Sequence, residues 1–247
     1  MGLSPAERER YQRQLGPGVL SEAGQLQLKQ ATVLITRVGG MGGPAAMALA
    51  MAGLGRIIIA HGGEFLSADL NRQMLGSEEI VGQRRVDHFA GRLRGVNHFI
   101  EVEAIDHEPD DEEALSLARR CQVILSCPPT FGERLRLNRA AVRSGVPLID
   151  AAQWGMTGTL TVVRPGETAC LACIYPELPP FEELFPVVGA ISSAIGSLAA
   201  LEAIKIVSHT GEPLWGKMLL YDGYHGRMQR VDLLRRPACP VCGAAAA

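Results

Sequence analysis

Short apolar runs alternate with helical patterns over most of the chain, and this alternation predicts an α/β fold. Runs of strand length cover residues 31–38, 56–60, 99–105, 121–127 and 146–152. Helical spacing of apolar and polar residues covers residues 44–54, 112–120 and 134–144. Strands that alternate with helices in this way build a mainly parallel, doubly wound sheet. We therefore expect such a sheet at the centre of the fold.

The two ends of the chain depart from this pattern. Residues 5–30 are polar and amphipathic, and Gly16, Pro17 and Gly18 interrupt them, so we expect a helical arm before the first strand. After Trp154, residues 157–165 and 216–234 alternate between apolar and polar positions and predict partly antiparallel strands. These strands would close or extend the sheet.

Composition and charge exclude several classes of partner. The chain has 247 residues with 24 Lys and Arg against 26 Asp and Glu, a formal charge of -2. Nucleic acids and anionic membranes are bound by clustered Lys and Arg, so we expect neither as a partner. The first fifteen residues are charged and lack the apolar core of a secretory signal, which predicts a cytoplasmic protein. The apolar residues 187–207 could span a membrane by length, but Glu202 and Lys205 favour a buried helix.

Two Cys-x-x-Cys pairs account for four of the six cysteines: Cys170, Cys173, Cys239 and Cys242. This spacing lets both sulfurs of a pair reach one tetrahedral ion, and four thiolates leave no open coordination position. The pattern therefore favours a structural zinc ion over redox-active disulfides. Such an ion would fasten the C-terminal tail to the loop after Pro165. Cys121 and Cys127 border a predicted strand in an apolar setting and are interpreted as core residues.

A glycine-rich turn, RVGGMGG at residues 37–43, follows the first predicted strand. In dinucleotide-binding turns, glycines let the backbone approach phosphates at a helix N-terminus, and Gly39 and Gly42 would be the second and third of them. Arg37 takes the place of the first glycine, so it could obstruct the turn or bring a guanidinium to the phosphates. A packing turn without a ligand is the alternative. His61 replaces the acidic residue that holds the ribose of NAD, which disfavours a dehydrogenase.

Several motifs occur in a characteristic order along the chain. They are RYQRQL (residues 10–15), VGGMGG (38–43), DLNRQML (69–75), GQRRV (82–86), the two Cys-x-x-Cys pairs and SLAALEAIKIV (197–207). Together they resemble the ThiF/MoeB/HesA family, the bacterial relatives of ubiquitin-activating enzymes, from about Arg10 to Cys242. The chain is identified as a divergent member of this family.

The resemblance implies a Rossmann-like domain that binds ATP and magnesium and adenylates a carboxylate. In the family this is commonly the C-terminal glycine of a small ubiquitin-fold sulfur carrier for molybdopterin or thiamine synthesis. Within one domain of residues 1–247, the resemblance implies a helical arm (1–30), a nucleotide-binding half (31–153) and a zinc-clamped, carrier-docking half (154–247).

The chemistry implied by the resemblance requires cations, because a carboxylate attacks an α-phosphate and the two anions repel each other. The resemblance assigns this role to Arg13, delivered from the neighbouring subunit of a homodimer, and to Arg72 and Arg85. The lack of an obvious partner for the N-terminal arm within the chain supports the homodimer. Residues expected around the nucleotide are Arg37, Gly39, Gly40, Gly42, His61, Asp69 and Gln73.

Some positions depart from the family's pattern. His61 and Gly63 stand at acidic positions, and the Asp-Asn pair that holds magnesium falls on Pro129 and Thr130. Each lost charged hydrogen bond would forfeit roughly 1.5–3 kcal/mol, so ATP binding is expected to weaken. Arg37 could compensate by neutralising phosphate charge. Residues 174–189 contain no cysteine, which disfavours the thioester that some family members form.

Two functions therefore remain open. The first is an enzyme that forms an acyl-adenylate on a carrier protein or a small carboxylic acid. The second is a catalytically inactive partner that docks a carrier protein or supplies Arg13 to an active subunit. Both predict the same fold, and they differ in whether the chain binds ATP.

Overall fold

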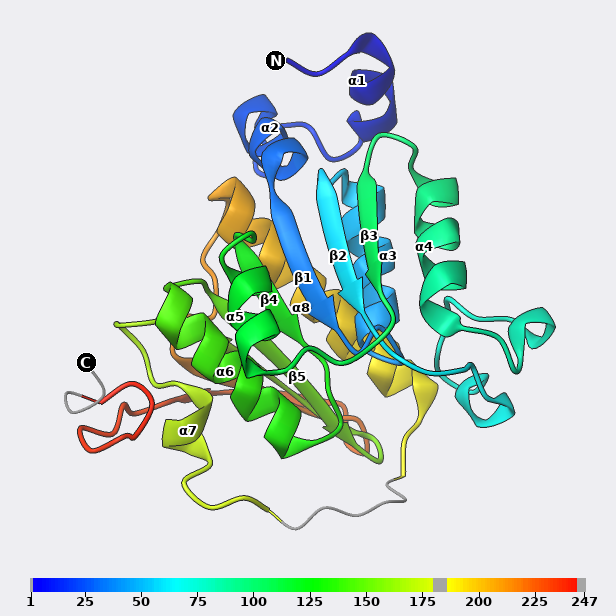
Figure 1. Ribbon diagram of the computed structural model, residues 1–247. Helices are drawn as coiled ribbons and strands as arrows, with labels where there is room; N and C mark the ends of the chain where they lie inside the picture. Colours follow the sequence, from blue (N-terminus) through cyan, green and yellow to red (C-terminus); the bar gives the residue numbers. More distant parts are fainter. Residues whose placement is uncertain (1, 180–185, 244–247) are drawn as a thin grey trace.

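A mixed sheet of eight strands forms the centre of the computed structural model, which describes residues 2–179 and 186–243 (Figure 1). The strands are β1 (Thr32–Thr36), β2 (Arg56–Ala60), β3 (Glu101–Ile105), β4 (Val123–Ser126), β5 (Leu148–Trp154), β6 (Thr157–Val163), β7 (Lys217–Asp222) and β8 (Arg227–Asp232). Their order is β3-β2-β1-β4-β5-β6-β7-β8. Neighbours from β3 to β5 are parallel, and those from β5 to β8 are antiparallel. The predicted sheet is confirmed, and the antiparallel strands β6, β7 and β8 from the second half of the chain extend it.

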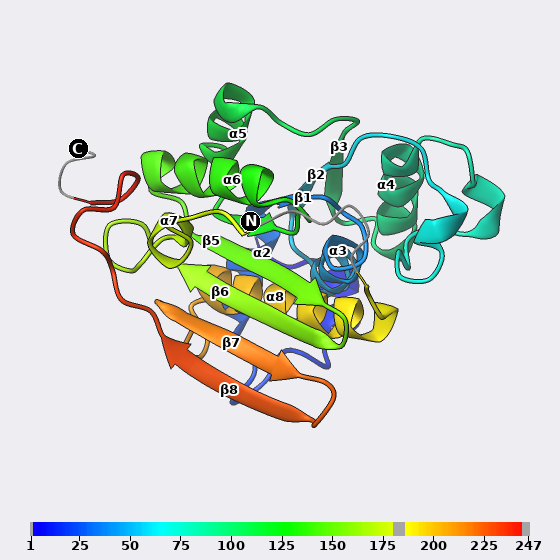
Figure 2. The same cartoon turned by 90° about the horizontal axis from the view of Figure 1, so that it is seen from below.

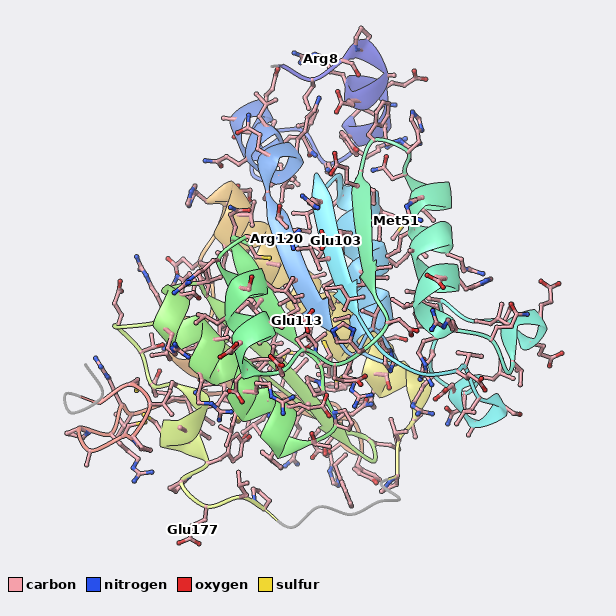
Figure 3. All side chains as sticks on the ribbon, in the orientation of Figure 1. Arg8, Met51, Glu103, Glu113, Arg120 and Glu177 are labelled. Atoms are coloured by element: carbon pink, nitrogen blue, oxygen red, sulfur yellow. The ribbon has the colours of Figure 1, made fainter. Side chains whose placement is uncertain are left out.

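Helices cover both faces of the parallel part of the sheet (Figures 1 and 2). They are α1 (Pro5–Tyr11), α2 (Glu22–Gln30), α3 (Gly42–Ala52), α4 (Arg85–Val96), α5 (Asp111–Ala118), α6 (Phe131–Ser144), α7 (Leu171–Ile174) and α8 (Gly189–Ser208), with short 3₁₀ turns η1 (Ser67–Asp69) and η2 (Glu78–Ile80). Helices α3, α4 and α8 lie on one face, and α5 and α6 lie on the other. On the surface, an ion pair between Arg120 and Glu103 joins the end of α5 to β3 (Figure 3).

Alternate side chains of each parallel strand pack against opposite helical layers. In β1, Val33 and Ile35 belong to the core on the side of α3, whereas Leu34 belongs to the core on the side of α5 and α6. All three side chains are fully buried. Because both faces of the sheet are covered, these strands are continuous apolar runs in the sequence.

The N-terminal arm packs against its own chain. Helix α1 begins at a capping box formed by Ser4 and Glu7. Tyr11 at its end is buried, and its hydroxyl accepts a hydrogen bond from the amide of Asn97 at 2.9 Å. The expectation that the arm lacks a partner within the chain is therefore wrong, and it no longer supports a homodimer.

Helix α8 is long and apolar enough to cross a membrane by length and composition, and half of that stretch is buried within the molecule. It packs between α3 and the strands β5 and β6, and Ile195 and Ala199 are fully buried. Within the described residues, α8 therefore has the environment of a core helix, as the sequence predicts.

Candidate functional site

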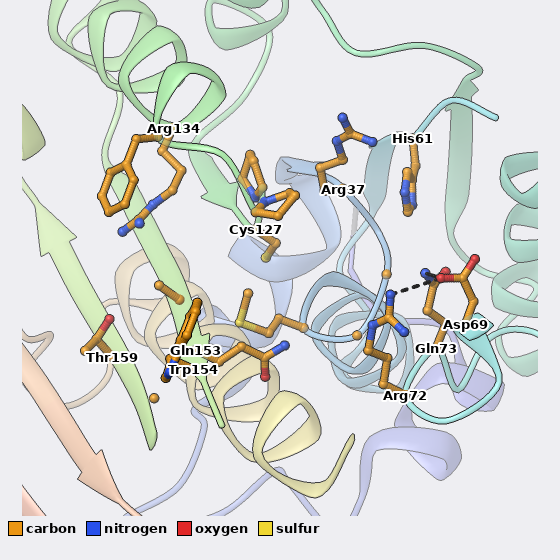
Figure 4. Close-up of a pocket in the computed structure, with 18 of the residues that line it drawn as sticks. Arg37, His61, Asp69, Arg72, Gln73, Cys127, Arg134, Gln153, Trp154 and Thr159 are labelled. Atoms are coloured by element: carbon orange, nitrogen blue, oxygen red, sulfur yellow. Dashed lines mark hydrogen bonds and ion pairs between the residues drawn. The ribbon is translucent and has the colours of Figure 1, made fainter. Parts of the chain in front are cut away.

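A cavity of about 490 Å³ opens at the carboxyl ends of the parallel strands (Figure 4). Its walls come from the turns after β1, β2 and β4, from the segment around η1, and from the ends of β5 and β6 that face each other. Open α/β sheets bind their ligands at this edge. The volume lies within the range of small-molecule sites.

The glycine turn after β1 forms one wall of the cavity. Arg37 begins the turn with a φ of 56°, in the left-handed region that favours glycine. A Cβ atom at Gly42 would lie 2.6 Å from the carbonyl oxygen of Arg37, so the turn requires glycine there. Gly39 and Gly40 line the cavity, whereas Gly42 supports the turn and begins α3. The turn therefore forms despite the arginine at its first position.

The guanidinium of Arg37 is bound by two carboxylates from distant parts of the chain. Its Nε and Nη2 donate to Glu133 at 2.8 and 3.0 Å, and its Nη1 lies 2.8 Å from Glu108. Burial lowers the pKa of Arg37, but Glu133 and Glu108 outweigh this effect and raise it. In Figure 4 the guanidinium turns away from Arg72 and Asp69. Its positive charge is therefore already matched within the protein.

Asp69 joins the two arginines that were expected at the phosphates. Its carboxylate lies 3.1 Å from Arg72 and 3.2 Å from Arg85, and it accepts a hydrogen bond from Gln73 at 2.6 Å. The backbone N–H of Leu66 donates to the same carboxylate. All four side chains named in this network line the cavity. The structure thus brings these expected site residues together.

His61 at the end of β2 is 5% exposed and lies at the wall of the cavity. Its Nε2 is 3.4 Å from the guanidinium of Arg85. Burial, followed by the charges of Arg85 and Arg37, lowers the pKa of His61 to about 3, so the ring is neutral at physiological pH. A neutral imidazole has one acceptor nitrogen, whereas the carboxylate expected at this position would offer two acceptor oxygens.

The far end of the cavity contains residues that the sequence analysis did not identify. Arg134 lies with its guanidinium carbon 4.5 Å from the ring centre of Phe131 and 5.4 Å from that of Tyr175. Its Nε donates to buried Asp150 at 3.0 Å, so its charge is paired. Trp154, which is 48% exposed, is the last residue of β5 and also lines the cavity. The signal available in the sequence was a tryptophan two residues beyond the predicted strand 146–152.

The end of β4 does not fit a magnesium ion. Pro128 and Pro129 line the cavity and offer no side-chain ligand. The hydroxyl of Thr130 caps α6 by accepting from the backbone of Glu133, and it donates to the carboxylate of that residue. Hard cations bind through carboxylate, carbonyl and water oxygens, and the positions expected to supply a carboxylate have none.

The four paired cysteines lie together beside α6 and α7. Their sulfur atoms all lie within 4.8 Å of one another, and all four residues are buried. Burial raises the pKa of Cys170 and Cys173; at Cys239 it is outweighed by backbone N–H groups of Cys242 and Val241, which lower the pKa to about 7. This arrangement fits a tetrahedral metal such as zinc and ties the C-terminal tail to α7. Cys121 and Cys127 are buried core residues, and Cys127 also lines the cavity.

Arg13 is exposed and follows the end of α1, and α1 lies beside the amino ends of the parallel strands (Figure 1). The residues that line the cavity lie instead at the carboxyl ends of the strands. Within the described part of one chain, Arg13 therefore does not lie with Arg72 and Arg85, the residues with which it was expected to act.

Comparison with known proteins identifies the family. The family model described as the ThiF family matches residues 11–241. HesA of heterocysts from Trichormus variabilis is 41% identical over 98% of this chain and 91% of its own length. The adenylyltransferase and sulfurtransferase MOCS3 from Sus scrofa is 36% identical over 98% of this chain, which spans 54% of that protein. The crystal structure of E. coli MccB with ATP covers 90% of this chain and 69% of its own, with 25% identity and a TM-score of 0.79. The chain belongs to the ThiF family.

Proposed function

We propose that this chain adenylates a carboxylate at the cavity beside the glycine turn. The observation that carries this proposal is the joined set of Asp69, Arg72 and Arg85 at the wall of the cavity. Arginine side chains in this position neutralise charge that develops when a carboxylate approaches a phosphate. The family membership and the similarity to MOCS3, whose name contains adenylyltransferase, support the reaction class.

In the proposed reaction, a carboxylate oxygen attacks the α-phosphorus of ATP. A new oxygen–phosphorus bond forms, the bond from the α-phosphorus to the bridging oxygen breaks, and pyrophosphate leaves with the electron pair. Arg72 and Arg85 bind the phosphate oxygens, and Asp69 holds both guanidinium groups in place. The backbone of Gly39 and Gly40 lets the phosphates approach the start of α3.

For the acceptor, we propose the C-terminal carboxylate of a small ubiquitin-fold carrier that ends in Gly-Gly, of the kind that transfers sulfur. The far end of the cavity, near Trp154 and Tyr175, is where an extended C-terminus would enter. We further propose a homodimer in which Arg13 of one copy serves the cavity of the other, since Arg13 follows α1, whereas its own cavity lies at the carboxyl ends of the strands. A zinc ion on the four cysteines would be structural, because four thiolates close its coordination shell.

A second function is favoured by Arg37, whose charge is taken up by Glu108 and Glu133. Without that charge at the phosphates, and without a magnesium ligand at Pro128 and Pro129, ATP binding loses two sources of stabilisation. In this second function the chain is an inactive partner that docks a carrier protein or supplies Arg13 to an active subunit.

Calorimetry and isotope exchange separate the two functions. Isothermal titration with ATP and magnesium, followed by pyrophosphate exchange in the presence of a Gly-Gly carrier, should show binding and exchange for the enzyme. Arg72→Ala should reduce exchange about 100-fold or more, since one preorganised donor is worth that factor. Arg92→Ala is the matched control, because Arg92 is exposed on α4. Carrier binding without ATP binding or exchange would leave only the inactive partner.

A further inference from the structure

We propose that the cavity selects its nucleotide without the ribose hydroxyls, so that ATP and its deoxyribose analogues bind with similar affinity. This inference rests on the proposed function and adds which nucleotides the site accepts. It follows from the hydrogen-bond acceptors around the end of β2, which bind side chains of the protein itself.

The fold places a bound ribose beside the end of β2. Strands β1 and β2 are neighbouring and parallel, so the glycine turn after β1 and His61 after β2 meet at one edge of the sheet. A Cβ atom at Gly39 would lie 3.4 Å from the ring of His61. In doubly wound folds with such a turn, an acidic residue about 20 residues further on hydrogen-bonds the ribose hydroxyl. In this chain, His61 stands at that position.

His61 offers no free acceptor in place of the acidic residue. Its ring is neutral at physiological pH, so only one of its two nitrogens accepts a hydrogen bond. A guanidinium group only donates, so the nitrogen that faces Arg85, Nε2 at 3.4 Å, is the accepting one. Nδ1 then carries the proton, and it is enclosed by protein without a partner among the described residues. No lone pair of His61 is therefore left for a ligand.

The backbone after β2 is engaged in the same way. The N–H of Gly62 donates to the carboxylate of Glu108 at 3.0 Å. The carbonyl oxygens of Gly63 and Glu64 both accept from the guanidinium of Arg85. Gly63, at the second acidic position of the family's pattern, has no side chain to replace them. The acceptors of this segment therefore bind an arginine of the protein.

Among the described residues that line the cavity, Asp69 has the only carboxylate. One of its oxygens accepts from Arg72 at 3.1 Å (Figure 4) and from Gln73 at 2.6 Å. The other accepts from the backbone N–H of Leu66 at 3.1 Å and lies 3.2 Å from Arg85. Two oxygens offer about four lone pairs, and four donors already surround them. Asp69 therefore has no acceptor left for a sugar hydroxyl.

The carboxylates behind this wall are paired as well. Glu108 and Glu133 both bind the guanidinium of Arg37. Asp106, directly after β3, lies 3.0 Å from Arg84. These three carboxylates are not among the described residues that line the cavity. A ribose beside His61 would thus meet no free charged acceptor in the described part of the chain.

The missing acceptor sets the expected size of the effect. A hydrogen bond from a hydroxyl to a carboxylate changes affinity by about 10- to 150-fold. A hydroxyl that exchanges water for water, or for a neutral group, contributes much less. The phosphates, which Arg72, Arg85 and the glycine turn are proposed to bind, are identical in ATP and its deoxyribose analogues. Removing the hydroxyls should therefore change the affinity little.

Isothermal titration of the wild-type chain with ATP, 2′-deoxy-ATP and 2′,3′-dideoxy-ATP, each with magnesium, tests this inference. The three dissociation constants should agree within about fivefold, because the analogues differ from ATP only in the sugar hydroxyls. A larger loss of affinity for either analogue would show that the site binds these hydroxyls and would overturn the inference.

His61→Asp tests the position of the sugar, because it restores a carboxylate at the end of β2. This variant should bind ATP at least about tenfold more tightly than 2′,3′-dideoxy-ATP. The ratio is measured within one variant, so a general loss of affinity cancels. His98→Asp, at an exposed histidine, is the matched control and should keep the wild-type ratio. An unchanged ratio in His61→Asp would place the sugar elsewhere and overturn the inference. Should this variant not fold, the wild-type series decides alone.

Pyrophosphate exchange with a Gly-Gly carrier separates this inference from the proposed function. Exchange with both ATP and 2′,3′-dideoxy-ATP would support both. Exchange with ATP alone would support catalysis and reject the inference. Similar binding of both nucleotides without exchange would support the inference and reject catalysis by this chain. Binding of neither nucleotide would reject both.

Discussion

At the scale of single residues, His61 gives the molecule a specific pH dependence. Its pKa is about 3 in the folded chain, against an ordinary value of 6.5, because it is buried beside Arg85. The contribution of His61 to the free energy of unfolding is fully present above pH 6.5. It is lost as the pH falls from 6.5 toward 3, because in this range His61 takes up a proton in the unfolded chain but not in the folded chain. Between pH 7.5 and pH 5.0 the loss is about 2 kcal/mol at 1.36 kcal/mol per pH unit.

Urea denaturation at these two pH values checks this prediction. His61→Gln should remove the difference, because glutamine does not titrate. His98→Gln, at an exposed histidine, should keep the wild-type difference. Equal acid sensitivity of the wild type and His61→Gln would show that His61 is not the responsible group.

Residue types and spacing revealed part of the site before the structure did. The spacing within each Cys-x-x-Cys pair was sufficient to predict a four-cysteine cluster, because the ligands of each pair are local. The partners of Arg37 could not be predicted in this way. Glu108 and Glu133 follow different strands, and only the order of β1, β3 and β4 in the sheet brings them to Arg37.

At the scale of elements, helix α8 holds the glycine turn in place. A Cβ atom at Gly196 would overlap the carbonyl oxygen of Met41, and one at Gly189 would overlap that of Asn71. Small residues on this helix therefore allow the backbone of two cavity walls to approach it closely. The apolar composition of residues 187–207, with Glu202 and Lys205, predicted a buried helix, but it did not indicate which backbone segments the helix contacts.

Gly196→Ala should destabilise the fold by roughly 1–3 kcal/mol, because the added methyl group has no space. Gly91→Ala is the matched control on α4, where a Cβ atom meets nothing within 4 Å. This control should stabilise the chain by about 0.5–1 kcal/mol through helix propensity. Thermal or urea unfolding of both variants measures the difference, and equal effects would argue against close packing at Gly196.

The cysteine cluster fastens one end of the chain. Cys239→Ser should abolish stoichiometric zinc in the purified protein and lower the melting temperature by roughly 5 °C or more. Cys121→Ser should keep the zinc, because its thiol donates to the carbonyl of Leu117 and lies outside the cluster. Elemental analysis and calorimetry provide the readouts. A wild-type chain that purifies without any metal would contradict the assignment.

At the scale of the whole molecule, the remote position of Arg13 predicts complementation between subunits. Arg13→Ala and Arg72→Ala should each lack adenylation activity. An equimolar mixture that is unfolded and refolded together should recover about one quarter of wild-type activity, because half of the dimers would carry one complete site. Recovery of no activity, or full activity of Arg13→Ala alone, would remove Arg13 from the proposed site.

The fold itself follows from patterns that are local in the chain. Strand β2 matches the predicted residues 56–60, because glycine breakers border a short apolar run there. Helix α3 begins at Gly42 rather than at residue 44, because the last glycines of the turn already have helical geometry. Boundaries therefore shift where one motif serves both as turn and as helix start.

Transfer of oxygen from the acceptor to AMP tests the central claim, carboxylate adenylation by this chain, most directly. A Gly-Gly carrier labelled with ¹⁸O in its C-terminal carboxylate would be incubated with the chain and ATP, and the AMP released after hydrolysis would be analysed by mass spectrometry. The proposed reaction predicts AMP that carries one ¹⁸O atom, since the carboxylate oxygen becomes bonded to the α-phosphorus. Unlabelled AMP, or no AMP above that formed by Arg72→Ala, would contradict it.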